Sequence, residues 1–256
     1  MSRPLGQAWA FLSHVPLRAE ASDRSECVNQ VLAGETVTEL SFGEGNWVEV
    51  ELPDGYRGWL DRRQLRPVTT MWVGQPLRLA ELSSAWENVA GGWLPAGACV
   101  RRLGARWFLG EDEIRPTSKV PSPFDGDMVD WALTMLGVPY HWGGRTGWGF
   151  DCSGLVSLAA ALVGLQVPRD ASQQFQVGLD VDLQRIRRND VAFFQNEEGR
   201  ITHVGICDGA GKVIHASGEV RVDQLDGQDL RRHEDGEVSH RLAGVKRWSR
   251  LDGQPQ

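Results

Sequence analysis

The chain has 256 residues, of which 41% are hydrophobic and 24% are charged, and its formal net charge is −7. This length suits two or three domains, because single domains cluster near ~100–150 residues. The acidic balance argues against nucleic acid as a partner, since phosphates require a basic surface. No segment approaches the ~20 consecutive apolar residues of a transmembrane helix, so we predict no membrane span.

The N-terminus and the cysteines bear on the cellular compartment. Ser13 and His14 interrupt the apolar run at residues 8–12, whereas a signal peptide requires ~7–15 apolar residues without a break. The four cysteines form no CxxC pair and match neither a disulfide scaffold nor a zinc ribbon. We therefore expect reduced thiols, no resident metal or cofactor, and a cytoplasmic protein.

Residues 1–68 contain short β-type runs separated by turn signals. The predicted strands lie at residues 31–32, 37–40, 47–52 and 56–60, and apolar side chains alternate at Val48, Val50 and Leu52. Residues 53–55 are Pro-Asp-Gly, a turn in which proline restricts φ and glycine tolerates positive φ. Strands this short and closely spaced predict a small all-β barrel or sandwich.

A second, fainter set of β-type runs follows at residues 71–79, 98–103 and 107–109. The two sets predict a duplicated all-β module, with one copy at residues 1–68 and the other at residues 69–118. Residues 117–124 are rich in proline and serine and are expected to form a linker.

Residues 119–251 have a different pattern, typical of helices followed by strands. Apolar residues between 128 and 136 recur at helical spacing, with Asp125 as the expected N-cap. A second helix at residues 152–162 is apolar on nearly all sides and should be buried. Strands are predicted at residues 191–194, 202–207 and 212–215, and the charge-rich run 223–241 is expected to be a solvated loop. This order predicts an α+β domain.

Cys152 is predicted on the first turn of the second helix, directly after a glycine-rich stretch. Backbone N–H groups and the positive end of the helix macrodipole lower the pKa of a thiol at that position. The same N–H groups are able to hold an oxyanion. For Cys152 alone, a small buried side chain without a chemical role is the alternative.

His203 and His215 lie on predicted strands that flank the turn at residues 208–211. If the hairpin is symmetric about Gly209, the even spacing places the two histidines opposite each other on one face. A base histidine whose ring is oriented by a second polar group is what a thiol nucleophile requires. Two surface histidines without a catalytic role are the alternative. A zinc site that adds Cys207 is another, although Cys207 is expected to pack in the core.

Five short motifs follow one another in the last domain: Tyr140-x-Trp-Gly-Gly, Asp151-Cys-Ser-Gly-Leu, Pro168-Arg-Asp, His203-Val-Gly-Ile and Ile214-His-Ala. Together they resemble the NlpC-type, papain-like cysteine peptidases of bacterial cell-wall metabolism. Arg18-Ala-Glu, residues 25–30 and Gly34-Glu are similar to the bacterial SH3-like barrels that precede such domains. The whole chain resembles the γ-D-glutamyl-L-diamino-acid endopeptidases, which carry two such barrels and cleave stem peptides with a free N-terminal L-alanine.

The resemblance implies a catalytic role for four residues. Cys152 would attack the side-chain carbonyl of D-glutamate. His203 would act first as general base and then as general acid, and His215 would orient it. Tyr140 would offer its hydroxyl to the oxyanion, beside the backbone N–H of Cys152.

The resemblance also implies a set of substrate-binding residues. Those that would line the subsites for L-alanine and D-glutamate are Asp151, Ser153 and Asp170. Glu26 would bind the free amino group, and Tyr56 would close over it. The family often has serine at the position of Ala171, and Ser172 is the nearest hydroxyl in this chain. A solvated carboxylate at Glu26 and a barrel-surface aromatic at Tyr56 remain the alternatives.

The function expected from the resemblance is hydrolysis of the γ-D-glutamyl bond in murein stem peptides during peptide recycling, by a monomer. A papain-like amidase or acyltransferase with another acyl donor is one alternative, because a Cys-His-His arrangement does not define the acyl substrate. A non-catalytic protein that binds cell-wall peptides is the other. The retention of Cys152, His203 and His215 argues against it.

Overall fold

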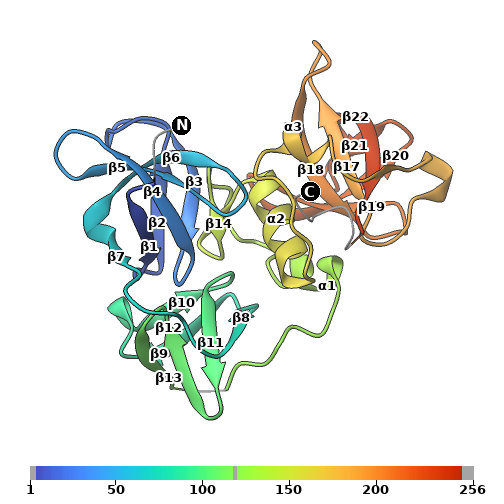
Figure 1. The fold of residues 1–256 in the computed structure, drawn as a ribbon. Coiled ribbons are helices and arrows are strands. Elements are labelled where there is room, and N and C mark those ends of the chain that lie inside the picture. The colour runs from blue at the N-terminus through green and yellow to red at the C-terminus, as the bar shows by residue number, and fades with distance from the viewer. Residues whose placement is uncertain (1–3, 118–119, 250–256) are drawn as a thin grey trace. The chain divides into compact units, whose positions relative to one another are not determined.

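The computed structural model describes residues 4–117 and 120–249 and divides into two compact units (Figure 1). Unit 1 contains the chain up to Phe124 together with residues 142–148, and unit 2 contains residues 125–141 and those from Gly149 onward. The segment 142–148 therefore belongs to unit 1, although the chain on either side of it belongs to unit 2. The predicted boundaries at residues 1, 118–119 and 251 lie outside the described residues.

The first part of unit 1 is a seven-stranded antiparallel sheet in the order β3-β2-β6-β5-β4-β1-β7. Its strands are β1 (Gly6–Ala10), β2 (His14–Arg18), β3 (Cys27–Leu32), β4 (Thr36–Phe42), β5 (Trp47–Glu51), β6 (Arg57–Asp61) and β7 (Leu65–Pro67). A 3-10 turn, η1 (Arg62–Gln64), precedes β7. The four predicted strands overlap β3 to β6 and differ from β5 and β6 by one residue at an end, whereas β1, β2 and β7 were not predicted.

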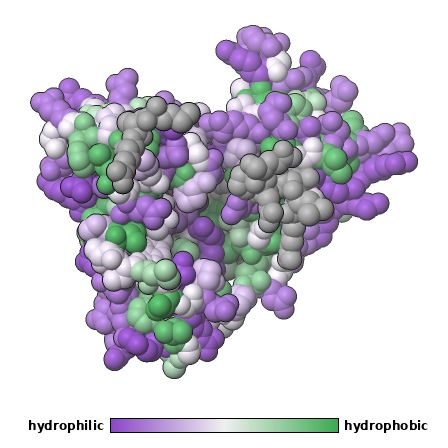
Figure 2. Space-filling model, in the orientation of Figure 1, coloured by the Kyte–Doolittle hydropathy of each residue, from purple (hydrophilic) through white to green (hydrophobic). Residues whose placement is uncertain are grey.

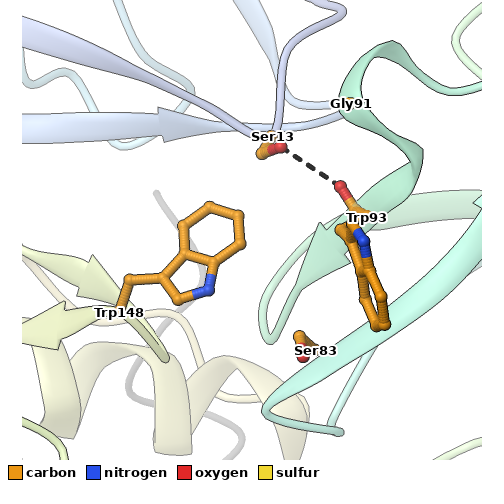
Figure 3. A pocket seen from close by; sticks show the side chains of 5 residues that line it. All are labelled: Ser13, Ser83, Gly91, Trp93 and Trp148. Atoms are coloured by element: carbon orange, nitrogen blue, oxygen red, sulfur yellow. Dashed lines mark hydrogen bonds between the residues drawn. The ribbon is translucent and has the colours of Figure 1, made fainter.

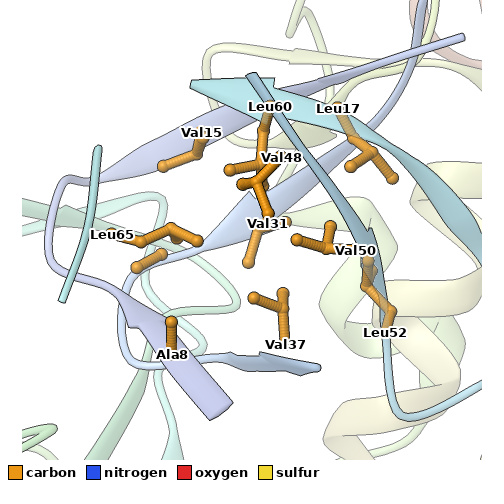
Figure 4. Packing of buried hydrophobic residues seen from close by; sticks show 11 residues of the cluster. Ala8, Val15, Leu17, Val31, Val37, Val48, Val50, Leu52, Leu60 and Leu65 are labelled. Carbon is orange, nitrogen blue, oxygen red and sulfur yellow. The ribbon is translucent and has the colours of Figure 1, made fainter. Parts of the chain in front are cut away.

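The core of this sheet follows from the alternation along its strands. Val48 and Val50 of β5 are fully buried and point inward toward Val31 and Leu60, whereas the intervening Glu49 is only partly buried (Figure 4). Complete burial of a valine or leucine side chain contributes about 1.5–3 kcal/mol relative to exposure. A period of two residues therefore determines which face of each strand turns to the core.

A six-stranded sheet follows in the order β10-β9-β13-β12-β11-β8. Its strands are β8 (Gln75–Arg78), β9 (Ser83–Glu87), β10 (Trp93–Pro95), β11 (Cys99–Leu103), β12 (Arg106–Leu109) and β13 (Asp112–Pro116), with the 3-10 turn η2 (Ala90–Gly92) between β9 and β10. This order repeats β3-β2-β6-β5-β4-β1 strand for strand. The prediction of a strand from residue 71 is wrong, because Met71 is 92% exposed and pairing with β11 begins at Gln75.

A buried ionic network holds the segment 142–148 within unit 1. The Glu35 carboxylate accepts hydrogen bonds from Arg78 (2.8 Å) and Arg145 (3.1 Å), and Arg145 also donates its backbone N–H to the side chain of Gln30. Gly143 has φ +75°, and a Cβ there would lie 2.2 Å from a backbone carbonyl oxygen. Glycine at this position therefore allows the segment, which includes β14 (Arg145–Thr146), to approach β3 closely.

Unit 2 begins with α1 (Met128–Leu133), α2 (Cys152–Leu162) and α3 (Ala171–Gln174), and also contains β15 (Gly149–Phe150). The start of α2 and its end agree with the prediction, whereas α1 is shorter than predicted. The N-cap of α1 is Asp127, not Asp125. Asp127 accepts from the N–H of Asp130 at 2.8 Å, and the Asp130 carboxylate accepts from the N–H of Asp127 at 3.1 Å. Asp125 has Met128 three residues later, which cannot complete such a reciprocal capping box.

The sheet of unit 2 has the order β16-β22-β17-β18-β19-β20-β21, and β22 also pairs with β21. Its strands are β16 (Leu179–Asp180), β17 (Val191–Gln195), β18 (Ile201–Cys207), β19 (Lys212–Ser217), β20 (Glu219–Asp226), β21 (Asp229–Arg231) and β22 (Val238–Arg247), and η3 (Leu183–Arg185) follows β16. Because β22 pairs with both β17 and β21, the six strands from β17 through β22 form a closed ring. The solvated loop predicted at residues 223–241 is therefore wrong, because most of that run forms β20, β21 and the start of β22.

Hydrophilic residues dominate the face of the molecule seen in Figure 2. Large apolar side chains that are exposed are scattered along the chain, as at Met71 and Leu179. Within the described ranges, no helix combines the length and hydrophobicity that crossing a membrane requires.

We predict that Asp127→Ala lowers the free energy of unfolding of unit 2 by about 1–2 kcal/mol, because α1 loses its N-cap. Asp125→Ala is the matched control and should change it by less than about 0.5 kcal/mol. Urea unfolding measures the free energy of unfolding of both variants. The signal is the fluorescence of Trp131, which lies on α1, in a protein whose other tryptophans do not change their fluorescence. Equal losses in the two variants would contradict the assignment of Asp127 as the cap.

We predict that Glu35→Gln destabilises unit 1 by about 3–5 kcal/mol, because two largely buried arginines lose their shared carboxylate. Hydrogen exchange at residues 142–148 should also become faster. Glu113→Gln removes an exposed pairing with Arg106 and should leave the urea midpoint unchanged. The same midpoint for both variants would show that the buried network does not stabilise this segment.

Candidate active site

Cys152 occupies the first position of α2 in unit 2. Asp151 is the N-cap and accepts from the N–H of Gly154 at 2.6 Å. The Cys152 thiol lies within hydrogen-bonding reach of the backbone N–H groups of Ser153 and Val204. Because Val204 follows His203 on β18, this contact places the thiol beside the strand that carries the predicted base.

The protonation state of Cys152 differs from the prediction. Burial, with a smaller contribution from the neighbouring Asp151 carboxylate, raises the pKa of its thiol to about 12. The two backbone N–H groups act in the opposite direction but do not compensate. The expected lowering of the pKa at a helix N-terminus is therefore wrong here, because desolvation outweighs it. At neutral pH Cys152 is a thiol and requires a base to become nucleophilic.

His203 and His215 lie together, but in a register that differs from the predicted one. Their imidazoles are joined by a hydrogen bond of 2.8 Å between His203 Nε2 and His215 Nδ1. The residue directly opposite His215 is Gly205, so the predicted pairing of His203 with His215 is wrong. The two histidines are diagonal neighbours on one face of the sheet, close enough for their side chains to meet.

The register follows from the turn between the two strands. The Asp208 carboxylate accepts from the N–H groups of Ala210 and Lys212, and Asp208 N–H donates to the Lys212 carbonyl. The hairpin is therefore centred on Ala210, one residue beyond the predicted centre at Gly209. An Asx turn of this kind is a local feature that spacing alone does not reveal.

Asp223 extends the histidine pair. Its Oδ2 lies 3.0 Å from His215 Nε2, and its Oδ1 accepts from Arg221 and from the backbone N–H of His233. Burial alone would raise the pKa of Asp223, but hydrogen bonds from His215 and Arg221 hold it well below its ordinary value. Asp223 is therefore a buried carboxylate in contact with His215.

His240 completes the cluster from β22. Its ring stacks on His203 with centroids 4.1 Å apart and an interplanar angle of 17°. Burial, followed by the nearby His240 and His215, lowers the pKa of His203 well below its ordinary value. Burial and His215 lower the pKa of His240 to about 4. At neutral pH both stacked imidazoles are uncharged, which leaves His203 able to accept a proton.

Tyr140 is half-buried, and its N–H donates to the carbonyl of Gly218. Burial raises the pKa of its hydroxyl well above the ordinary value, and Cys152 and Asp151 raise it further. The hydroxyl is therefore protonated at all physiological pH values and is available as a hydrogen-bond donor.

Two of the predicted substrate-binding residues of unit 2, Asp151 and Ser153, hydrogen-bond to each other at 3.3 Å. Arg169 forms a bidentate ion pair with Asp151, at 3.0 and 2.5 Å, and donates to Ser153 Oγ at 2.8 Å. Asp170 is the N-cap residue of α3. Gln174 is fully buried and donates to the backbone carbonyls of residues 153 and 168. These contacts give Asp151 and Ser153 a role in ordering the start of α2.

Glu26 and Tyr56 belong to unit 1. Glu26 is exposed and accepts a hydrogen bond of 2.5 Å from the indole N–H of Trp142. Tyr56 is partly buried and packs against the core of the first sheet. Trp142 is part of the segment 142–148, so within unit 1 this segment contacts the loop that carries Glu26.

Unit 1 also contains a cavity of about 470 Å³, lined by Ser13, Ser83, Gly91, Trp93 and Trp148 (Figure 3). The indoles of Trp93 and Trp148 border it from two different segments, and Ser13 Oγ donates to the Trp93 carbonyl at 3.1 Å. None of these residues was predicted to have a function.

Cys207 does not join the histidines. It is 1% exposed and packs in a hydrophobic cluster with Phe194 and Leu242, as the packing alternative predicted. Within residues 4–117 and 120–249, no group of three or more His, Cys, Asp or Glu side chains is arranged as a metal site.

Sequence reasoning missed Arg169 as an ion-pair partner, Asp223 and His240. Asp223 and His240 lie in the charge-rich run that was predicted to be a loop. Val220 and Val222, which follow the strand of His215, were a weak signal for β20. Nothing local indicated that β22 would bring His240 against His203, because the two residues are far apart in the chain.

Comparisons with known proteins match a part of each unit to a family, independently of this geometry. Residues 137–237 match the NlpC/P60 family, and residues 17–65 match the family described as bacterial dipeptidyl-peptidase SH3 domain. A γ-D-glutamyl-L-lysine dipeptidyl-peptidase of Bacillus subtilis is 32% identical over 211 residues, covering 73% of this chain and 71% of that protein. The protein of the same name from Bacillus cereus is 26% identical over 222 residues, covering 73% of this chain and 66% of that protein.

A solved structure supports the same grouping at the level of the fold. The crystal structure of an NlpC/P60 family protein from Bacillus cereus superposes with a TM-score of 0.74 at 20% identity, covering 94% of this chain and 99% of that one. The chain therefore belongs to the NlpC/P60 family of cysteine peptidases and carries a bacterial dipeptidyl-peptidase SH3 domain.

Proposed function

We propose that this protein hydrolyses the γ-D-glutamyl-L-diamino-acid bond of peptidoglycan stem peptides that begin with a free L-alanine. The observation that carries the proposal is the arrangement in unit 2. A buried thiol at a helix N-terminus lies beside β18, and His203 on that strand is bonded to His215. The names of the Bacillus relatives favour this bond among those open to a cysteine peptidase. A role in murein peptide recycling, in the cytoplasm and as a monomer, is part of the proposal.

The proposal extends to the domain organisation. The repeated strand order of the two sheets in unit 1 supports two SH3-like barrels, at residues 1–68 and 69–118. The helices and the ring of strands in unit 2 support an α+β, papain-like catalytic domain at residues 119–251.

In the proposed reaction, neutral His203 takes the thiol proton as the sulfur of Cys152 attacks the side-chain carbonyl carbon of D-glutamate. The backbone N–H of Cys152 and the hydroxyl of Tyr140 donate to the resulting oxyanion. His203 then protonates the leaving amine of the diamino acid, and a thioester remains on Cys152. A water molecule deprotonated by His203 attacks this thioester, L-Ala-D-Glu is released, and the proton on His203 returns to the sulfur of Cys152.

Substrate selection in this proposal rests on carboxylates. Glu26 binds the ammonium group of L-alanine through a charge-assisted hydrogen bond, and Tyr56 covers it. Asp151, Ser153 and Asp170 line the subsites for L-alanine and D-glutamate. Ala171 removes a hydroxyl that the family often has at this point. The barrels then restrict the enzyme to released peptides and exclude the intact wall.

We predict that the purified protein releases L-Ala-D-Glu from L-Ala-γ-D-Glu-diaminopimelate, and that N-acetylation of the peptide abolishes the reaction because Glu26 loses its cationic partner. Mass spectrometry measures both peptides. Cys152→Ala should eliminate cleavage, whereas Cys207→Ala, which removes another buried thiol of unit 2, should retain it.

Other outcomes of this experiment distinguish the alternatives. Cleavage of the acetylated peptide, or rapid release of peptides from intact sacculi, would contradict the amino-terminal selection. If neither peptide is cleaved but Cys152 is acylated by another donor, the protein is an amidase or acyltransferase. Peptide binding without any reaction would make it a binding protein.

We predict that the acid limb of kcat/KM lies below pH 6.5, the ordinary pKa of histidine. His203 must be neutral to act as a base, so activity is lost as the pH falls through its pKa, and that pKa is lowered. A pH profile of kcat/KM measures the limb, with Cys152→Ala as the blank. A limb at or above pH 6.5 would contradict a neutral buried base.

A further inference from the structure

We propose that Asp223 is a positioning residue that sets the direction of the histidine hydrogen bonds, so that Nδ1 of His203 carries no proton and serves as the base. This inference rests on the proposed role of His203 toward Cys152. None of the five sequence motifs includes Asp223, which lies in the run predicted to be a loop.

The direction follows from counting protons along the chain of contacts. Ionised Asp223 is only an acceptor, so its Oδ2 accepts a hydrogen bond of 3.0 Å from the protonated Nε2 of His215. A neutral His215 then presents a bare Nδ1. This nitrogen accepts from His203 Nε2 across 2.8 Å. A neutral His203 with its proton on Nε2 has a lone pair on Nδ1, the tautomer required of a base.

Burial of the three side chains prevents the histidines from exchanging between tautomers, which would reverse the direction of these hydrogen bonds. His215 is fully buried, Asp223 is 2% exposed and His203 is 5% exposed. Inside such an environment, an alternative tautomer would leave two facing N–H groups or two facing lone pairs, at a cost of about 1–3 kcal/mol for the unsatisfied group. The Asp223 carboxylate, at the end of this series of hydrogen bonds, is therefore sufficient to select one tautomer for both imidazole rings.

The carboxylate is itself fixed from the opposite side. Asp223 Oδ1 accepts from Arg221 Nη2 at 2.9 Å and from the backbone N–H of His233 at 3.1 Å, and Arg221 is also paired with Glu234. Another titratable group that faces these contacts is His240, stacked on His203 from β22. Burial and His215 lower the pKa of His240 to about 4, so it adds no charge near neutral pH.

These contacts make Asp223→Asn a directional test. Arg221 and the His233 N–H are donors, so the asparagine must place its carbonyl oxygen at the Oδ1 position. Its NH₂ group then faces His215 Nε2 and donates where the carboxylate accepted. His215 must carry its proton on Nδ1 and donate to His203 Nε2. His203 is left with its proton on Nδ1, the wrong tautomer for a base.

The experiment compares Asp223→Asn, Asp223→Ala and wild type in two readouts. The first is histidine nitrogen NMR of the full chain, which reports the tautomer of each ring without any substrate. We expect Nε2–H on both His203 and His215 in wild type, and Nδ1–H on both in Asp223→Asn. A wild-type His203 with its proton on Nδ1 would overturn the proposal, whatever the variants do.

The second readout is kcat with L-Ala-γ-D-Glu-diaminopimelate as a function of pH. Asp223→Asn should lose about 10²–10⁴-fold in kcat, the contribution of a general base. Its residual activity should rise with pH instead of reaching a plateau, because only thiolate formed without the base can react. Asp223→Ala places no N–H donor against His215 Nε2, so its kcat should fall by less than that of Asp223→Asn. Equal losses with an unchanged profile would overturn the proposal and make Asp223 merely structural.

Asp190→Asn is the matched control for folding. Asp190 is another buried carboxylate of unit 2, and its side chain accepts hydrogen bonds from Arg247 and from the backbone N–H of Arg187 and not from any histidine of the described ranges. Its loss should lower stability but leave the histidine tautomers and the shape of the pH profile unchanged. If wild type does not cleave the peptide at all, the proposed function fails, while the NMR readout still decides the role of Asp223.

Discussion

The hydrogen bond between His203 and His215 is the interaction on which the chemistry of unit 2 depends. It exists because the Asx turn at Asp208 centres the β18–β19 hairpin on Ala210 and makes the two histidines diagonal neighbours. A shift by one residue along either strand would turn one histidine to the opposite face. The position of the base is therefore determined by a turn whose hydrogen bonds join residues 208, 210 and 212 to one another.

The charge state of the site follows from burial more than from pairing. Desolvation raises the pKa of Cys152 and lowers that of His203, so the resting groups are a thiol and a neutral imidazole. The helix N-terminus, which lowers the pKa of more exposed thiols, is outweighed. Proton transfer then has to accompany attack, and the tautomer of His203 becomes decisive. For this reason the Asp223 carboxylate, which reaches His203 only through His215, affects the reaction in our proposal.

Unit 1 shows a comparable dependence on a buried charge. Glu35 joins Arg78 of the second sheet and Arg145 of the segment 142–148, while Trp142 in the same segment donates to Glu26. The loop that carries Glu26 and the segment 142–148 are thus parts of one compact unit.

The sequence by itself determined the features that depend on local periodicity. The apolar pattern at residues 152–162 placed Cys152 at the start of a buried helix, and even spacing placed His203 and His215 on one face. Only the tertiary structure decided the hairpin register, the raised pKa of Cys152 and the arrival of Asp223 and His240. The physical reason is that side-chain periodicity encodes which face of an element is buried. Desolvation and long-range strand pairing, such as the closure of the ring by β21 and β22, depend on contacts between residues far apart in the chain.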